Sequence, residues 1–599
     1  MPIQAIDWGA LIPSRSQGPR KAVYGSDLVV DLLKAYGFPY VCANIGSSFR
    51  GVWDSLLNYG DSPEAISVTH EEIAVAMAHG HFKASGKPLA VLLHDLVGLQ
   101  HATMAIFNAW CDRVPIFLLG AEGPMGTEKR RPWIDWVHTA ETPNTQVRDY
   151  VKWDAFPRSA ESIPESMIRA HVQMMLEPQA PVYVCFDSTH LEERLPAGTP
   201  HPDIGEYQTE ALPEGNSEAL LRTAKALVSS DSPFIVAGRI GRRAGAVDSL
   251  VRLAELLGAS VVDLGQSFCF PNTHPLDATE MGAIGGADAI LALEAPTLET
   301  VIVETDKATR RSKPLVRQGA SIYEVGLGDF LVRSWAGDHQ RFLPARERIL
   351  SDAPLAVGSL VRLCSDMMEG DSGARSRAKE RAAAARARHL EYRQKWSREA
   401  SKRFDESPIS PQRLALEVWE KIKKRDWVLA NGNLAGWARR LWEWTKPGCY
   451  LGGSGGAGLG YGLPASVGAA LALRGTGKLV VDLQPDGDLL YSAGALWTAA
   501  HYRIPLLIVV FNNRAYHNDA EHNRLISAAR GRDASRAYHV GGDLTEPEVD
   551  FSALAESFGV KGIGPVEKPE KLAESLERAV RVVTAEGLPA LVDVFTSAR

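Results

Sequence analysis

A short acidic turn at residues 486–488, Asp-Gly-Asp, and an asparagine that follows it, Asn513, most constrain what this chain can fold into. Between them, residues 493–501 have the pattern of a helix, and residues 504–511 form a continuous apolar run typical of a buried strand. A strand, a helix and a second strand in this order predict neighbouring parallel strands. Because open α/β sheets bind ligands at the carboxyl edge of such strands, we expect Asp486 and Asn513 to lie side by side there.

Asp486 and Asn513 offer the kind of ligand that a hard cation requires. Magnesium prefers oxygen ligands in a near-octahedral array and usually shares them with a phosphate. An Asp-Gly-Asp sequence is also a common turn signal, so these residues alone equally allow a buried unit whose polar ends only cap and turn the chain. The choice between a metal site and a structural turn therefore depends on motifs elsewhere in the chain.

Length and composition indicate a multidomain globular protein. The 599 residues exceed what one core holds, and the content of 45% hydrophobic and 23% charged residues is ordinary. The net charge of −7 gives no reason to expect nucleic acid, and no apolar run approaches the roughly 20 residues that cross a membrane. The first 20 residues carry no secretory pattern, and the six scattered cysteines favour buried, reduced thiols over disulfides. We expect a cytoplasmic protein with neither nucleic-acid nor membrane partners.

Apolar strands alternate with helical patterns in three regions, residues 1–195, 218–366 and 409–599. This alternation predicts an α/β protein with three domains, each built on a doubly wound parallel sheet. A charged, alanine-rich segment at 373–404 is typical of a helical linker between the second and third regions. In the second region, Gly-Arg-Ile-Gly at 238–241 follows a strand but lacks the full dinucleotide fingerprint, so it is only a weak nucleotide signal.

The segment around Glu71 resembles a known motif. It reads His-Glu-Glu at 70–72, then a helix of small residues at 74–84, then Gly-Lys-Pro at 86–88. A glutamate at a helix start is often only a surface charge that suits the helix dipole. The whole pattern, however, resembles the activating-glutamate segment of the thiamin diphosphate (ThDP)-dependent decarboxylase and acetolactate synthase superfamily.

Two segments of the third region support the same resemblance. The spacing of Asp486 and Asn513 resembles the superfamily's ThDP motif, and the glycine-rich segment 455–464 resembles its cofactor-clasping loop, where glycine permits close backbone approach to a flat ring. The resemblance implies ThDP and Mg²⁺ as cofactors, with Asp486, Asn513 and the carbonyl of Ala515 as metal ligands. It implies Glu71 as the residue that activates the aminopyrimidine. The further cofactor-binding residues that it implies are Asn431, Gly432, Asn433, Ala457, Gly458, Leu459, Gly487, Asp488 and Tyr516.

The resemblance also implies an arrangement of domains and subunits. The three regions correspond to pyrimidine-binding, middle and diphosphate-binding domains, in the order of the pyruvate decarboxylase branch. In that branch the activating glutamate of one subunit meets the diphosphate held by another, so we expect a homodimer or a dimer of dimers. One departure is Pro485, since the family usually has glycine before the metal-binding aspartate, and proline removes an N–H and fixes φ. We expect metal ligation to survive, with the strand end shaped differently.

Within the superfamily, the chain is most similar to benzoylformate decarboxylase. The similarity covers Asn-Ile-Gly-Ser at 44–47, His94 and a further segment at 495–500. It implies that Ser47 holds the substrate carboxylate and that His94 moves protons, a role that suits an imidazole whose pKa lies near working pH. His274, in a segment that is also similar to this enzyme, is either a catalytic or only a structural histidine.

The similarity weakens just after Asn513, where the substrate is expected. This chain places Tyr516, His517 and further polar residues there, in a segment that becomes arginine-rich towards residue 536. Unpaired polar groups against a benzene ring cost about 1–3 kcal/mol each, so we expect a polar or differently placed substrate. Tyr516 and His517 are also candidates for moving protons. The expected reaction is the decarboxylation of a 2-oxo acid, followed by protonation of the product or its attack on a second carbonyl.

Three alternatives stay open. An acetolactate synthase-like carboligase usually carries Ser-Gly-Pro-Gly where this chain has Asp-Leu-Val-Gly at 95–98, and Leu-Glu-Ala-Pro-Thr at 293–297 replaces its flavin-binding segment, which argues against FAD. A 2-hydroxyacyl-CoA lyase fits the arginines in segment 517–536, although a solvated loop explains them as well. A non-catalytic scaffold that kept the fold is suggested by Pro485 and the polar segment.

Overall fold

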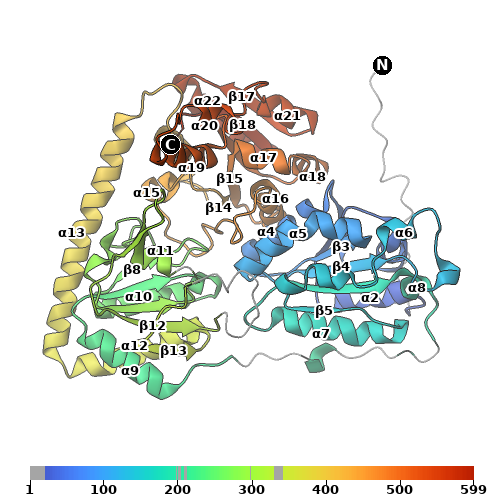
Figure 1. The fold of residues 1–599 in the computed structure, drawn as a ribbon, viewed down its shortest axis with the longest axis horizontal. Coiled ribbons are helices and arrows are strands. Elements are labelled where there is room, and N and C mark those ends of the chain that lie inside the picture. The colour runs from blue at the N-terminus through green and yellow to red at the C-terminus, as the bar shows by residue number, and fades with distance from the viewer. Residues whose placement is uncertain are drawn as a thin grey trace.

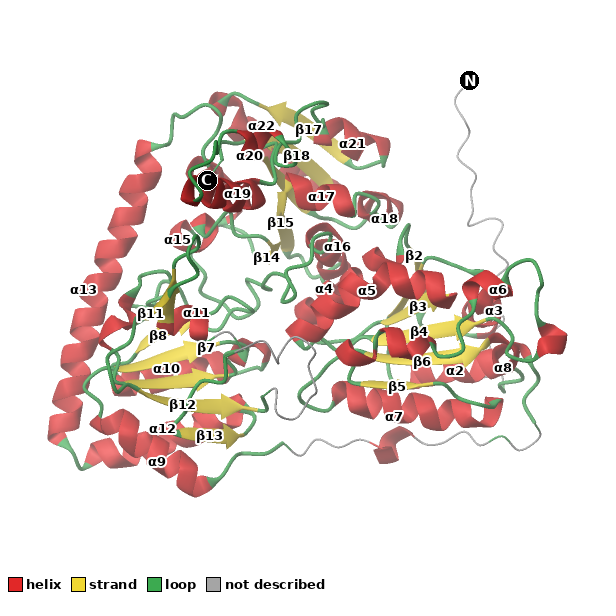
Figure 2. Ribbon diagram, in the orientation of Figure 1, coloured by secondary structure: helices red, strands yellow, loops and turns green. Residues whose placement is uncertain are grey.

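The computed structural model describes residues 21–196, 199, 204–207, 212–296, 298–328 and 341–598. Apart from one small antiparallel ribbon, the described strands form three parallel sheets with helices packed against their faces (Figure 2). A long helix, α13 (Ser372–Lys402), runs along the outer side of the molecule from the second domain to the third (Figure 1). The α/β fold class with three parallel-sheet domains is therefore confirmed.

The first domain contains a six-stranded parallel sheet in the order β2-β1-β3-β4-β6-β5. Its strands are β1 (Tyr40–Ala43), β2 (Glu64–Ser67), β3 (Ala90–His94), β4 (Phe117–Glu122), β5 (Trp153–Ala155) and β6 (Val182–Asp187). The helices around it are α2 (Gly25–Ala35), α3 (Arg50–Asp54), α4 (Glu71–Ser85), α5 (Asp95–Asp112), α6 (Asp135–His138), α7 (Ile163–Met175) and α8 (Ser188–Glu192). Strands β3, β4 and β6 are buried almost throughout, as continuous apolar runs in a parallel sheet require.

The second domain contains a five-stranded parallel sheet in the order β13-β12-β9-β7-β8. Its strands are β7 (Pro233–Ala237), β8 (Ser260–Asp263), β9 (Ala289–Leu293), β12 (Ser321–Gly326) and β13 (Glu347–Leu350). Its helices are α9 (Ser217–Ser229), α10 (Ala246–Leu257), α11 (Glu299–Ile302) and α12 (Ala353–Glu369), and β10 (Val303–Thr305) pairs with β11 (Ser312–Pro314) in a small antiparallel ribbon.

The third domain contains a five-stranded parallel sheet in the order β14-β15-β16-β18-β17. Its strands are β14 (Trp427–Asn431), β15 (Leu479–Pro485), β16 (Leu507–Asn512), β17 (Lys561–Val566) and β18 (Ala590–Phe595). Its helices are α14 (Pro411–Ile422), α15 (Trp437–Leu441), α16 (Gly462–Ala472), α17 (Asp486–Tyr491), α18 (Ala495–His501), α19 (His517–Ala529), α20 (Arg536–His539), α21 (Phe551–Ser557) and α22 (Pro569–Arg581). The neighbouring pair β15 and β16 is the unit that the opening motif predicts.

The Asp-Gly-Asp sequence forms the start of a helix rather than a turn. Asp486 is the first residue of α17, and Pro485 is both the last residue of β15 and the N-cap of the helix. Pro485 has a φ of −68°, an ordinary value for proline, and lies level with Phe511 of β16. The proline therefore ends the strand without moving Asp486 away from the sheet edge.

Two crossing helices join the first domain to the third. Helices α4 and α16 pack so closely that a Cβ on Gly80 would lie 1.9 Å from the carbonyl oxygen of Ala465, and one on Gly468 would lie 1.9 Å from that of Met77. Only glycine fits at both positions. The contact places the first turn of α4, which carries Glu71, beside the glycine-rich loop that precedes α16 (Figure 1).

No helix in the part of the chain that the structure describes is both long and apolar enough to span a membrane. None of the six cysteines, all of which lie among the described residues, forms a disulfide, and all except Cys111 are buried. Burial raises the pKa of Cys42, Cys364 and Cys449 to about 12, so these thiols are poor nucleophiles.

Candidate active site

A cavity of about 630 Å³ opens at the carboxyl edge of the third domain's sheet. Its volume falls within the roughly 300–1,000 Å³ of small-molecule sites. The described residues that line it all belong to the third domain, and they bring together strand ends and loops that are far apart in sequence. The sequence-predicted residues among them are Asn431, Gly432, Asn433, Ala457, Gly458, Leu459, Asp486, Gly487, Asp488, Asn513, Ala515, Tyr516 and His517.

Asp486 is 3% exposed at the start of α17. Its Oδ1 accepts the N–H of Gly487 at 2.9 Å, and its Oδ2 accepts the N–H of Arg514 at 2.7 Å. Burial raises the pKa of Asp486 to about 6, and these backbone N–H groups oppose part of that rise. A cation bound here would lower the pKa again, because it stabilises the charged form of the carboxyl group.

Asn513 follows β16 at the same edge of the sheet. Its Oδ1 accepts the N–H of Ala515 at 2.9 Å. Asn512, one residue earlier, is buried and donates from Nδ2 to Asp593 at 3.1 Å, because successive residues of a strand point to opposite faces. The structure therefore brings together Asp486, Asn513 and Ala515, the residues expected to bind the metal.

Asp488 ties the glycine-rich loop to α17. Its Oδ1 accepts the N–H of Gly460 at 2.8 Å, and its Oδ2 accepts the N–H of Gly462 at 3.2 Å. The side chain of Gln484 donates a further bond to Oδ2 at 2.7 Å. Burial raises the pKa of Asp488, and the bonds to its two oxygens oppose the rise. Asp488 thus lines the cavity while it fixes the shape of the loop.

The glycine-rich loop presents Ala457, Gly458 and Leu459 to the cavity. Ala457 has a φ of +53°, in the left-handed region that residues other than glycine adopt rarely and often at functional sites. Asn108 of α5 holds Gly458 through two hydrogen bonds, one to its carbonyl at 3.3 Å and one from its N–H at 3.2 Å. Leu459 remains 39% exposed at the cavity wall, where an apolar ligand surface can cover it.

The end of β14 lies against β15 beneath the cavity. Gly432 has a φ of +76°, and a Cβ there would lie 2.0 Å from the carbonyl oxygen of Leu483, so only glycine fits. Asn431 donates from Nδ2 to Asp482 at 3.0 Å, and burial raises the pKa of Asp482 to about 8. Asn433 accepts a backbone N–H at 3.0 Å and so caps the next turn. These polar groups form a fixed floor for a ligand.

Glu71 is the first residue of α4 and is 4% exposed. Asn44 donates from Nδ2 to its Oε1 at 3.1 Å, and His101 Nδ1 lies 3.2 Å from its Oε2. A Cβ on Gly98 would lie 3.2 Å from the Glu71 Oε1, so a small residue is needed there. Glu71 is therefore a held, buried carboxylate, but it does not line the 630 Å³ cavity of its own chain.

The sequence analysis did not predict the environment of Glu72. Its carboxylate lies against the glycine-rich loop, where a Cβ on Gly460 would be 3.0 Å from its Oε1. Burial, with the charge of Asp488, raises the pKa of Glu72 to about 7. Two consecutive glutamates at a helix start were the sequence signal for this second environment, because neighbouring residues of a helix point in different directions.

His94 and Ser47 both lie at the carboxyl edge of the first domain's sheet, but they do not bond to each other. His94 Nδ1 lies 2.8 Å from the Oγ of Ser48, a residue that the sequence analysis did not select. Ser47 Oγ instead accepts a hydrogen bond from Arg131 at 3.0 Å. Burial lowers the pKa of His94, which favours the neutral imidazole. A Cβ on Gly46 would overlap the His94 ring, so the ring's position depends on that glycine.

His274 lies in the middle domain, and the structure does not bring it to the cavity. Its Nδ1 accepts the N–H of Leu276 at 3.2 Å, and its Nε2 lies 3.3 Å from Glu255. Its ring packs edge-on against Phe270 at 5.0 Å. These contacts hold a loop of the middle domain, which fits the structural alternative for this residue.

The cavity suits a ligand that carries phosphate and magnesium. Two of its hydroxyl groups, on Ser454 and Thr596, are buried without a hydrogen-bond partner in the described part of the chain. Buried polar atoms normally bond to protein, water or ligand. The oxygen-only donor set of Asp486, Asn513 and the Ala515 carbonyl matches the preference of Mg²⁺. The residues present therefore fit the cofactor and metal that the motifs imply.

Comparison with known proteins assigns all three domains. Models of the thiamine pyrophosphate enzymes match the chain at residues 23–145 (N-terminal TPP binding domain), 220–303 (central domain) and 430–594 (C-terminal TPP binding domain). The chain belongs to the thiamine pyrophosphate enzyme family. The resemblance read from the motifs around Glu71 and Asp486 is confirmed, and so is thiamin diphosphate, the same compound, as the cofactor of the family.

Two curated relatives of this thiamine pyrophosphate enzyme cover nearly its whole length. Benzoylformate decarboxylase of Pseudomonas aeruginosa is 26% identical over 581 residues, which are 94% of this chain and 97% of the relative. A probable acetolactate synthase large subunit of Methanocaldococcus jannaschii is 25% identical over 580 residues, 92% of this chain and 90% of the relative. The two names represent the two enzyme types between which the sequence motifs leave a choice.

Solved structures show the same fold. A ThDP-dependent 4-hydroxybenzoylformate decarboxylase of Rhodococcus jostii superposes with a TM-score of 0.73 at 21% identity and covers 96% of this chain and 99% of its own. Benzoylformate decarboxylase of Polynucleobacter necessarius gives a TM-score of 0.74 at 18% identity, with 96% and 99% covered. At these identities the comparison supports the three-domain architecture alone.

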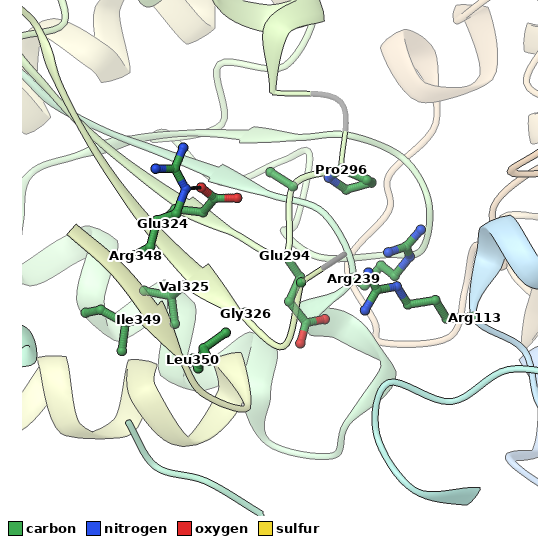
Figure 3. Close-up of a pocket in the computed structure, with 12 residues that line it drawn as sticks. Arg113, Arg239, Glu294, Pro296, Glu324, Val325, Gly326, Arg348, Ile349 and Leu350 are labelled. Atoms are coloured by element: carbon green, nitrogen blue, oxygen red, sulfur yellow. Dashed lines mark ion pairs between the residues drawn. The ribbon is translucent and has the colours of Figure 1, made fainter. Parts of the chain in front are cut away.

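Described residues of this thiamine pyrophosphate enzyme enclose a small cavity at the carboxyl edge of the middle domain's sheet. The cavity there has a volume of about 60 Å³, far below the roughly 300 Å³ of the smallest typical ligand sites. Charged side chains line it, and Glu324 pairs with Arg348 at 3.0 Å (Figure 3). Glu294, a second acidic residue of the lining, pairs with Arg242 at 2.7 Å. That FAD does not bind here stays a prediction, and this crowding supports it.

Proposed function

We propose that this enzyme uses ThDP and Mg²⁺ to decarboxylate a polar 2-oxo acid and releases an aldehyde or joins the remaining fragment to a second carbonyl. The observation that carries the proposal is the 630 Å³ cavity, in which the Asp486–Asn513–Ala515 cluster meets a polar wall at the start of α19. The names of the relatives, which are decarboxylases and acetolactate synthases, support the same reaction class.

In this proposal the third domain holds the cofactor. Asp486, Asn513 and the Ala515 carbonyl would hold Mg²⁺ beside the diphosphate. The carbonyl of Ala457 would accept a hydrogen bond from the cofactor, and Leu459 would pack against it. Bound ThDP would supply an electron sink for the loss of carbon dioxide, and the protein supplies orientation and charge.

The activating carboxylate comes from a second copy of the chain. Glu71 does not line the cavity of its own subunit, although it is buried and held by Asn44 and His101. Glu71 of the partner subunit would bond the aminopyrimidine, so a homodimer is the smallest active unit. A dimer of dimers would repeat this arrangement.

In this proposal, residues of the first domain bind the substrate carboxylate and move protons. Ser47 with Arg131 binds the carboxylate, since the guanidinium bonded to Ser47 is the stronger partner for an anion. His94 is held by Ser48 and kept neutral by burial, so it can take a proton and return it. Tyr516 and His517 are the second candidates for proton movement, because both line the cavity.

The cavity wall selects a polar substrate. The first residues of α19, His517, Asn518 and Asp519, line the cavity where an aromatic ring would need apolar contacts. Each polar group left unpaired by such a ring costs about 1–3 kcal/mol. A 2-oxo acid with hydroxyl or amide groups satisfies these side chains instead.

The arginine-rich segment 517–536 gives less support to a CoA thioester as substrate. Arg524 is paired with Glu521 at 2.9 Å, so its charge is already balanced within the helix. Arg514, near the cavity, is paired with Glu548 at 2.9 Å. An acetolactate synthase-like carboligase has more support than a 2-hydroxyacyl-CoA lyase, because the acetolactate synthase relatives extend over nearly the whole chain.

The proposal is tested by carbon dioxide release from a panel of 2-oxo acids. The panel includes pyruvate, benzoylformate and hydroxylated aliphatic acids, each with ThDP and Mg²⁺, and acyloin products are followed in parallel. We expect saturable release that requires both cofactors and is fastest with a hydroxylated acid. Release from none of these acids, with no acyloin, would contradict the proposal, and benzoylformate as the best substrate would overturn the polar-substrate part of it.

A further inference from the structure

Two buried acids meet at the carboxyl edge of the first domain's sheet. Asp95 is the first residue of α5, directly after β3, and Glu122 is the last residue of the neighbouring strand β4. In the pairing of β3 with β4, His94 lies opposite Ala121. Asp95 and Glu122 each come one residue later in the chain, so they are neighbours as well. Asp95 is 1% exposed and Glu122 is 0% exposed.

Each acid accepts one backbone hydrogen bond, and each keeps one buried oxygen to which no other described residue donates. Asp95 Oδ1 accepts the N–H of Gly123 at 3.1 Å, and Glu122 Oε2 accepts the N–H of Ala140 at 3.0 Å. The other two oxygens, Asp95 Oδ2 and Glu122 Oε1, are buried and receive no N–H or O–H from another described residue. The two carboxyl groups are in hydrogen-bond contact with each other. Two buried carboxylates in contact cannot both be charged, whereas one proton between them satisfies both oxygens.

We propose that Asp95 and Glu122 share one proton, and that this acid pair sets the charge and the orientation of His94. Neither acid touches the 630 Å³ cavity, so both would be positioning residues. The part of this inference that concerns His94 rests on the proton-moving role given to it above. The shared proton itself does not depend on any activity of the enzyme.

The link from the acid pair to His94 is short. His94 Nδ1 lies 3.7 Å from Asp95 Oδ2 and 2.8 Å from Ser48 Oγ. A carboxylate beside one ring nitrogen fixes the tautomer and stabilises the protonated ring, as in hydrolase triads. With one proton shared, the pair carries a single negative charge, part of which lies next to His94.

Other titratable groups approach the pair and His94 from several elements. Arg131, in the loop before α6, pairs with Asp135 at 2.8 Å, and the His138 ring lies 5.6 Å from the His94 ring. On β6, burial raises the pKa values of Tyr183 and Cys185 far above neutrality. Burial and the charge of His138 lower the pKa of His94, and the negative charge of Glu71 of α4 opposes part of this fall.

The electrostatics of the pair agree with one shared proton at neutral pH. Burial raises the pKa of Asp95 to about 6. Burial, together with the charge of Asp95, raises the pKa of Glu122 to about 9. Glu122 therefore keeps the proton at pH 7 while Asp95 carries most of the charge.

Infrared spectroscopy of the purified protein tests the shared proton directly. The pKa values of Asp482 and Glu72 are also raised, so the test uses the wild-type spectrum minus the spectrum of Glu122→Gln. At pH 7 this difference spectrum should contain the C=O band of a buried, protonated carboxylic acid. Glu128→Gln, which changes an exposed glutamate in the same domain, is the matched control, and the same subtraction should give no such band. Glutamine keeps the shape of the side chain, and equal far-ultraviolet circular dichroism spectra would show that the fold is intact. A difference spectrum of wild type and Glu122→Gln without this band would overturn the proposal.

A metal ion is the competing explanation of the cluster. Ligand atoms of His94, Asp95 and His138 lie within 4.8 Å of one another, a spacing that a bound ion could bridge. Elemental analysis of the protein decides this point. One equivalent of tightly held zinc per chain, with the acid band appearing only after chelation, would overturn the shared proton.

The pH dependence of turnover tests the effect on His94. Asp95→Asn removes the charge beside the imidazole and should move the limb of the kcat profile that His94 controls about one unit to lower pH. Glu122→Gln leaves the full charge on Asp95 and should move the same limb to higher pH. The double variant should behave like Asp95→Asn. Unmoved limbs in both single variants would refute the link to His94. An enzyme inactive on every 2-oxo acid would refute the proposed function, and the infrared result would still decide the acid pair.

Discussion

The sheets of the first and third domains each have a buried aspartate at the carboxyl edge, and the two aspartates differ in their surroundings. Asp95 in the first domain and Asp486 in the third each follow a parallel strand and each begin a helix. They are 1% and 3% exposed, and burial raises the pKa of each to about 6.

The difference lies in what surrounds each carboxyl group. Asp486 borders a 630 Å³ cavity, and its nearest hydrogen-bond partners are backbone N–H groups of residues 487 and 514. Asp95 instead contacts a second acid, Glu122, and neither of them lines that cavity. Space and a set of oxygen donors make the first edge suitable for a metal and a diphosphate, while the paired acids make the second suitable for holding a proton.

Asp486→Ala should have the largest effect. It removes the only charged ligand of the proposed metal site, so ThDP binding in the presence of Mg²⁺ should become undetectable by calorimetry. Asp95→Asn, at the equivalent place in the other sheet, should bind the cofactor normally. If both variants lost ThDP binding equally, the distinction drawn between the two edges would be wrong.

Glu71→Gln should lower kcat by about 10²–10⁴-fold, the range for loss of an acid–base group. Its melting temperature should change little, because glutamine can still accept from Asn44. Glu72→Gln is the matched control, since the adjacent glutamate contacts the glycine-rich loop instead, and it should lose far less activity.

Mixing two inactive variants tests the subunit arrangement. Dimers formed from Glu71→Gln and Asp486→Ala chains contain one site with both lesions and one site with neither, if each site uses Glu71 of the partner subunit. Such mixtures should regain activity. Mixtures that stay inactive, with exchange of subunits verified, would place both residues of a site on one chain.

Asn518→Leu should separate polar from aromatic substrates. Removing one hydrogen-bonding group from the wall should raise KM for the preferred polar acid about tenfold, the equivalent of about 1.4 kcal/mol. The same change should lower KM for benzoylformate. Equal effects on both substrates would show that this wall does not choose between them.

Glu122→Gln should flatten the pH dependence of stability. The unfolded chain loses this proton near pH 4.3, whereas the folded protein keeps it until about pH 9. Stability from this group is therefore full at low pH and falls as the pH rises, by about 1.4 kcal/mol per unit. The wild type should lose melting temperature between pH 6 and 8 more steeply than the variant, and parallel curves would argue against a proton held by Glu122.

The fold and the cofactor could be predicted from the sequence because their signals are local. Continuous apolar runs marked strands such as β3 and β6, and the Glu71 and Asp486 motifs indicated the family that the comparisons confirm. The short helix α17 was missed, because two acids and a glycine suggest a turn unless the preceding strand end is known.

The contacts that define the environment of each residue could not be predicted in the same way. Ser48 rather than Ser47 bonds to His94, because the rotation of a short turn decides which hydroxyl faces the ring. The meeting of Asp95 and Glu122 joins residues on different strands. Sequence spacing gives no measure of such distances, and no motif marks them.

Calorimetric titration of ThDP into the wild-type protein tests the central claim most directly. With Mg²⁺ present we expect one ThDP to bind per chain, and with the divalent cation chelated the affinity should fall steeply, because the diphosphate is held through the metal at Asp486 and Asn513. No binding in the presence of Mg²⁺, or binding that is equally tight after chelation, would contradict the account.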